Sequence, residues 1–292
     1  HTGSDPIHQR GTMKDSDLFA EYVRRLAPRP TGMRPQMHLR SPVRAVVFAV
    51  YGTLFISASG DITRIPDNSR ALGAMAKLLR SHAIEQSAED FLGRISDAVN
   101  AALCQKRAEG IDHPEVRIDQ IFQDVLATDD RGLARRLALG FELIANPPYP
   151  MPDLDELLVA CRREGLKLGL ISNAQFYTPL LFQHFFGRPP RELGFDAKLI
   201  LYSYTLGLAK PAADLFEKAA HRLQEYGISR ESVLYVGNDM LCDIYPAHQA
   251  GFQTALFAGD KRSLRLRQDD PRCQGLVPDA VITGLGQLRR MI

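Results

Sequence analysis

The 292-residue sequence contains no tryptophan, and no stretch is apolar over the roughly 20 residues that a membrane-spanning helix needs. It also lacks the charged start and apolar run that mark a secretory signal. These absences argue against an integral membrane protein and against export. We therefore expect a cytoplasmic protein that has no membrane partner.

The chain also has few cysteines and a small net charge. Cys104, Cys161, Cys242 and Cys273 form neither a CxxC pair nor a zinc-site spacing, so we expect free thiols in a reducing compartment. The net charge of +2 is too close to zero to indicate nucleic acid as a partner. Hydrophobic residues make up 45% of the chain, which argues for a normal folded core. The oligomeric state stays open.

What the sequence does contain is an alternation of short apolar strands with amphipathic helices. This pattern predicts the α/β class with a doubly wound parallel sheet. Strands are expected near 45–49, 166–171, 199–202, 232–236, 254–257 and 280–282. Helices are expected at 153–165, 176–186, 211–226 and 241–250, with one more after the last strand.

Two segments at the start of the chain differ from this alternation. Residues 1–12 look like the remnant of an expression tag, and Met13 is the expected native start. Residues 13–42 are punctuated by prolines and predict an N-terminal arm that lies as a strap over the core. A short helix is expected at 15–26 of this arm, with Ser16 as its N-cap.

A long insertion follows the first core strand. Helical periodicity dominates residues 56–148, and a proline cluster at 147–152 marks the return of the chain. The pattern predicts an all-helical cap domain at 56–148. The core domain then consists of 43–55 and 149–292.

Four polar motifs stand at the expected strand ends. The carboxyl ends of parallel strands share one edge of a sheet, so we expect the four motifs to meet in one crevice. The motifs are Ala49-x-Tyr51-Gly52-Thr53, Ser172-Asn173, Lys210-Pro211 and Gly237-Asn238-Asp239-x-x-x-Asp243.

In order and spacing, these motifs resemble those of the haloacid dehalogenase (HAD) superfamily of hydrolases. In that family an apolar strand delivers an aspartate nucleophile, which forms a covalent ester and so splits one difficult step into two. The resemblance implies a Rossmann-like core with a helical cap, a small anionic substrate and Mg²⁺ as cofactor. It favours a phosphomonoesterase activity.

The resemblance also implies a role for each motif residue. Ser172 would donate a hydrogen bond to the transferred group, and Lys210 would supply a positive charge to it. Gly52, Thr53 and Asn173 would contact the substrate. Asp239, Asp243 and the backbone carbonyl of Tyr51 would hold Mg²⁺.

Two residues depart from the family pattern. Ala49 stands at the nucleophile position and carries no carboxylate, so we expect little or no covalent activity and weak or absent Mg²⁺ binding. Tyr51 stands where most phosphatases of the family have a second aspartate, and a tyrosine there resembles the dehalogenase branch. The acidic fourth motif resembles the phosphatase branch.

Three functional hypotheses therefore stay open. The first is a phosphatase whose native residue at position 49 is aspartate and was replaced by alanine. The second is a natural pseudoenzyme, which keeps the site as a binding surface. The third is a metal-independent 2-haloacid dehalogenase, which Tyr51 alone indicates.

Overall fold

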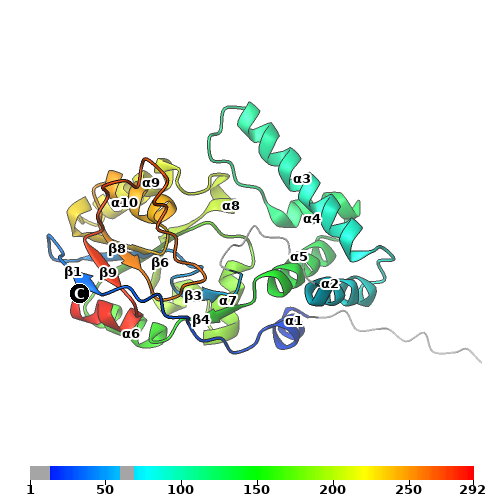
Figure 1. The fold of residues 1–292 in the computed structure, drawn as a ribbon, viewed down its shortest axis with the longest axis horizontal. Helices are drawn as coiled ribbons and strands as arrows, with labels where there is room; N and C mark the ends of the chain where they lie inside the picture. Colours follow the sequence, from blue (N-terminus) through cyan, green and yellow to red (C-terminus); the bar gives the residue numbers. More distant parts are fainter. Residues whose placement is uncertain (1–13, 60–68) are drawn as a thin grey trace, which may run out of the picture.

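The computed structural model describes residues 14–59 and 69–292. The expected tag remnant at 1–12 and the expected start at Met13 lie outside the described residues. The described chain forms two lobes, a sheet with helices on both faces and a bundle of helices beside it (Figure 1).

The central sheet has the strand order β1-β9-β8-β7-β2-β5-β6. All neighbouring pairs are parallel except β1 and β9, which are antiparallel. This confirms the predicted α/β class. The strands are β1 (Gln36–Met37), β2 (Ala45–Phe48), β5 (Lys167–Ser172), β6 (Phe195–Tyr202), β7 (Val233–Gly237), β8 (Gln253–Phe257) and β9 (Ala280–Ile282).

Strand β2 lies at the centre because both of its faces are apolar. Val46 and Phe48 belong to one hydrophobic cluster, and Ala45 and Val47 belong to the other. Successive side chains of a strand point to opposite faces, so a continuous apolar run is buried from both sides. The same rule places the residue after β2, Ala49, inside the protein.

Helices cover both faces of the sheet. One face packs against α6 (Leu154–Arg163) and the short helix η4 (Leu285–Arg290), and the other against α9 (Ala213–Gln224) and α10 (Tyr245–Gln249). The helix expected at 241–250 begins instead as a π-helical turn, η3 (Met240–Ile244). The other core helices are α7 (Thr178–Phe186), α8 (Ser203–Leu206), η1 (Pro190–Leu193) and η2 (Arg230–Ser232).

Residues 69–147, which precede β4, form the helical lobe. The chain enters and leaves this lobe through an antiparallel two-stranded ribbon, β3 (Phe55–Ser57) with β4 (Pro148–Pro150), which the proline cluster did not predict. The side-chain oxygen of Asn146 accepts hydrogen bonds from the hydroxyls of Ser57 and Ser59, both at 2.8 Å. The helices are α2 (Ser69–Ser81), α3 (Ala88–Ala108), α4 (Ile118–Leu126) and α5 (Arg131–Ala145).

Glu142 of α5 is a buried carboxylate beside this ribbon. It accepts hydrogen bonds from the Tyr177 hydroxyl at 2.9 Å and from the Asn146 amide at 3.2 Å. Burial nevertheless raises the pKa of Glu142 from 4.5 to about 7. Below about pH 7 the neutral acid of Glu142 is therefore favoured over the charged form.

The raised pKa of Glu142 predicts a specific pH dependence of stability. Between pH 4.5 and about 7 the folded state holds a proton that the unfolded state has released, so stability falls as the pH rises through this window. The loss is on the order of 3 kcal/mol. Urea denaturation from pH 5 to 8 should show this fall. Glu142→Gln should flatten it, and the exposed control Glu89→Gln should leave it unchanged; an unchanged slope in Glu142→Gln would refute the assignment.

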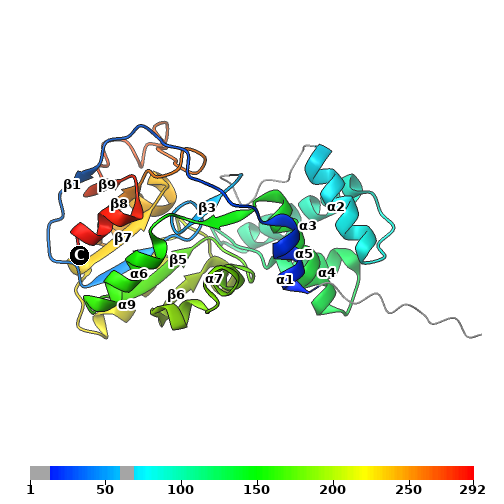
Figure 2. The same cartoon turned by 90° about the horizontal axis from the view of Figure 1, so that it is seen from below.

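The N-terminal arm contacts both lobes. Helix α1 (Asp15–Tyr22) packs against α5, and the Phe19 ring stacks on His184 of α7 at 4.3 Å. The arm then crosses to the sheet edge at β1 (Figure 2). Helix α1 has Lys14 rather than Ser16 at its N-cap position. Of the described helices, none is long and apolar enough to cross a membrane.

Candidate functional site

The predicted site lies where the strand order reverses around β2. Strand β2 pairs with β5 on one side and with β7 on the other, and ligands of doubly wound sheets bind beyond the carboxyl ends of such strands. A pocket of about 310 Å³ lies there. The predicted site residues that line this pocket are Tyr51, Ser172, Asn173, Lys210, Asp239 and Asp243.

Ala49, at the end of β2, is only 2% exposed. The next backbone N–H, that of Val50, donates to the Ser172 hydroxyl at 3.3 Å, and this hydroxyl donates to the Asn173 carbonyl at 3.2 Å. The position after β2 is therefore held beside Ser172, as the motifs predicted. Its side chain supplies only a methyl group.

Tyr51 lines the pocket and is anchored at its hydroxyl. That oxygen lies 3.1 Å from the hydroxyl of Thr178, at the start of α7. Burial, together with the charge of Glu142, raises the pKa of Tyr51 well above its ordinary value. Tyr51 is therefore a neutral phenol that can donate or accept a hydrogen bond.

Gly52 and Thr53 support the pocket from behind its wall. The Thr53 hydroxyl donates to the Asn238 side-chain oxygen at 3.0 Å, and the Asn238 amide donates to the Ser263 carbonyl at 2.7 Å. Gly52 has φ +79°, and a Cβ there would lie 2.7 Å from the Asn238 amide nitrogen. Both the turn and the close approach therefore require glycine.

Asp243 is a buried carboxylate whose two oxygens both accept hydrogen bonds. It forms an ion pair with Lys210 and accepts a hydrogen bond from the Tyr235 hydroxyl at 3.0 Å. Its other oxygen accepts the backbone N–H groups of Asn238 and Asp239 at 2.9 and 3.0 Å. With four donors around it, Asp243 has its oxygens occupied by the protein itself.

The carboxylate oxygens of Asp239 also accept hydrogen bonds from the protein, and here the paired cation is Arg267. One of its oxygens accepts the backbone N–H groups of Leu241 and Cys242 at 2.9 and 3.0 Å. The Arg267 guanidinium binds both oxygens, with its shortest contact at 2.6 Å. Arg267 has a left-handed backbone at φ +51°, which non-glycine residues rarely adopt. Contacts with the rest of the protein, such as the pair with Asp239, therefore stabilise this loop conformation.

This arrangement does not fit the implied Mg²⁺. A hard cation needs unoccupied oxygen ligands, but Arg267 covers Asp239 and Lys210 covers Asp243. Ala49 supplies no third carboxylate. Within residues 14–59 and 69–292, no three His, Cys, Asp or Glu side chains are grouped to hold a metal ion.

We therefore expect millimolar Mg²⁺ to leave the melting temperature of the protein unchanged, because binding would have to break the Asp239–Arg267 pair. Titration calorimetry should detect no saturable binding. Arg267→Gln uncovers Asp239 and should gain weak binding, whereas Arg272→Gln, which alters an exposed ion pair with Asp270, should gain none. Micromolar Mg²⁺ affinity in the unaltered chain would contradict this expectation.

The sequence did not single out several residues that line or support the pocket, among them Tyr235, Arg265 and Arg267. Tyr235 reads as one more buried strand residue, and the two arginines belong to a loop without periodicity. The nearest signal in the sequence is the charged turn at 259–262, which directly precedes this loop. In the structure Asp260 of that turn is buried and paired with Arg262.

A doubly wound sheet with a polar pocket at its switch point and inserted helices beside it is the architecture of a Rossmann-like hydrolase with a helical cap. A model of the haloacid dehalogenase-like hydrolases matches residues 43–251. The match covers most of the chain, so this protein belongs to the haloacid dehalogenase-like hydrolase family. The matched region ends before the loop that carries Arg265 and Arg267.

A solved structure supports the fold. The chain is similar to a 2-haloacid dehalogenase from Pseudomonas syringae pv. Tomato DC3000, with 21% identity and a TM-score of 0.52 over 85% of this chain and 97% of the other. It is also similar to a HAD phosphatase from Thermococcus onnurineus (19% identity, TM-score 0.49, 85% and 97% covered). A third similar structure is a putative HAD-hydrolase from Bacillus subtilis bound to magnesium (19%, 0.49, 86% and 98%). No curated protein matches the sequence.

Proposed function

We propose that this protein binds a small phosphorylated molecule in the pocket beyond β2 and, with alanine at position 49, does not hydrolyse it through a covalent intermediate. The observation that carries this proposal is the combination of Ala49 with an otherwise assembled site around Ser172 and Lys210. The site keeps the groups that would hold a phosphoryl oxygen. It lacks the group that would attack the phosphorus.

Unused hydrogen-bond donors favour an anionic ligand. The formal charges that line the pocket cancel, since Lys210, Arg265 and Arg267 face Glu115, Asp239 and Asp243. The oxygens of Asp239 and Asp243 already accept several hydrogen bonds each. Lys210 and Arg267 have more N–H groups than their carboxylate partners use.

Titration calorimetry with inorganic phosphate tests this proposal. We expect saturable binding by the unaltered chain and at least a tenfold loss in Arg267→Ala, which removes donors and leaves Asp239 unpaired. Arg272→Ala, in the same loop but outside this pocket, should bind phosphate as the unaltered chain does. Equal affinities in the two variants, or no binding by the unaltered chain, would overturn the proposal.

A metal-independent hydrolase is the second candidate. The Asp239–Arg267 pair favours it, because a protein cation stands where the acidic motif would otherwise hold Mg²⁺. Tyr51 also favours it, since a neutral phenol is a weaker proton carrier than the aspartate of the phosphatase branch. Turnover of a 2-haloacid without metal by an Ala49→Asp variant would support this alternative.

A further inference from the structure

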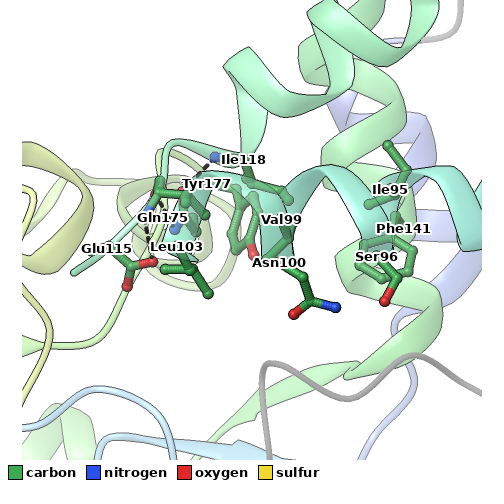
Figure 3. Close-up of a pocket in the computed structure, with 11 residues that line it drawn as sticks. Ile95, Ser96, Val99, Asn100, Leu103, Glu115, Ile118, Phe141, Gln175 and Tyr177 are labelled. Carbon is green, nitrogen blue, oxygen red and sulfur yellow. Dashed lines mark hydrogen bonds between the residues drawn. The ribbon is translucent and has the colours of Figure 1, made fainter. Parts of the chain in front are cut away.

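A second pocket, of about 320 Å³, lies beside the polar one in the helical lobe. Its wall is formed by one side of α3, by α5 and by the loops around Val116 and Gln175 (Figure 3). The apolar residues of the wall are Ile95, Val99, Leu103, Val116, Ile118 and Phe141. We refer to this pocket as the apolar chamber.

The apolar chamber adjoins the polar pocket. Leu103 and Glu115 line both of them. Figure 3 shows the lining residues spread along α3, from Leu103 beside Glu115 at one end to Ile95 and Phe141 at the other. The two pockets therefore offer a polar end and an elongated apolar extension to a single ligand.

Hydrogen bonds between the lobes hold the chamber wall in place. The Gln175 side chain accepts the Ile118 N–H at 3.0 Å and donates to the Val116 carbonyl at 2.9 Å. The Glu115 N–H donates to the Gly207 carbonyl at 3.0 Å. Collapse of the chamber would break these bonds, so apolar surface stays uncovered beside the site until a ligand covers it.

Glu115 sets the direction in which a ligand would lie. Its carboxylate accepts the Val116 N–H at 2.9 Å and the Ser203 hydroxyl at 2.7 Å. A negative charge at this junction disfavours a second anionic group there. The anionic group therefore belongs at the Lys210 and Arg267 end, and an uncharged part of the ligand passes Glu115.

We propose that the ligand is an amphipathic phosphomonoester, with its phosphate in the polar pocket and an alkyl or aryl group in the apolar chamber. This inference rests on the proposed phosphate binding and specifies the rest of the molecule. Buried apolar groups gain affinity in proportion to the surface that they remove from water. The chamber should thus discriminate ligands by the length of their apolar group.

Calorimetric titrations with inorganic, methyl, butyl and hexyl phosphate provide the test. Affinity should rise by about three- to fourfold per methylene that enters the chamber. Val99→Phe places a phenyl ring in the chamber and should abolish this rise while leaving the affinity for inorganic phosphate unchanged. Ala101→Phe puts the same ring at an exposed position of α3 and should keep the rise.

The outcomes separate the two proposals. A chain-length series with constant affinity overturns the chamber inference and leaves phosphate binding intact. A rise that persists in Val99→Phe also overturns it, because the alkyl group would then bind elsewhere. No binding of inorganic phosphate by the unaltered chain overturns the proposed function itself.

Discussion

Ala49→Asp is expected to hydrolyse p-nitrophenyl phosphate about 10⁴-fold faster than Ala49→Asn. Removal of a single catalytic residue commonly lowers kcat by about this factor. Position 49 lies beside Ser172, and Lys210 lines the pocket ahead of it. An aspartate there would supply the missing nucleophile to groups that can hold the phosphoryl oxygens.

Ala49→Asn is the matched control, since it adds the same volume at a buried position without a nucleophilic carboxylate. Release of p-nitrophenol should be followed with Mg²⁺ and with a chelator, because the occupied Asp239 predicts that Mg²⁺ has little effect. If Ala49→Asp and Ala49→Asn are equally inactive on the ester and on 2-chloropropionate, the site has lost more than its nucleophile. The chain would then be a pseudoenzyme that only binds.

Lys210→Met should lower the free energy of unfolding by about 3–5 kcal/mol, because it leaves the carboxylate of Asp243 buried without its cation. The side chains of Lys210 and Asp243 are only 6% and 2% exposed. The hydroxyl of Tyr235 and two backbone N–H groups would remain around Asp243. They stabilise the charge in part and do not replace the ion pair.

Urea denaturation of a double-mutant cycle checks this expectation. Lys210→Met with Asp243→Asn should cost less than the sum of the two single changes, since neither buried charge is then left alone. Lys198→Met provides the control, because its ion pair with Glu225 is largely exposed and should matter little. A small loss in Lys210→Met would mean that the Lys210 ammonium adds little to the stability of the site.

The sequence by itself determined the α/β class, the family and the place of the site. Apolar strands and amphipathic helices have local periodicities that can be read along the chain. Motifs that follow parallel strands must share one edge, so the order of the strands and motifs is enough to place Tyr51, Ser172, Lys210 and Asp243 together. The alanine at position 49 is likewise read directly from the sequence.

Only the tertiary structure decided which partners the acidic residues have and what lies beside the site. Arg267 is 28 residues from Asp239, on a loop without periodicity, and reaches it because the chain folds back. The apolar chamber joins α3 to the loop at Gln175, two segments that look like ordinary packing surfaces when read alone. Ion pairs and cavities depend on distances between remote segments, and such distances leave no pattern in a single sequence.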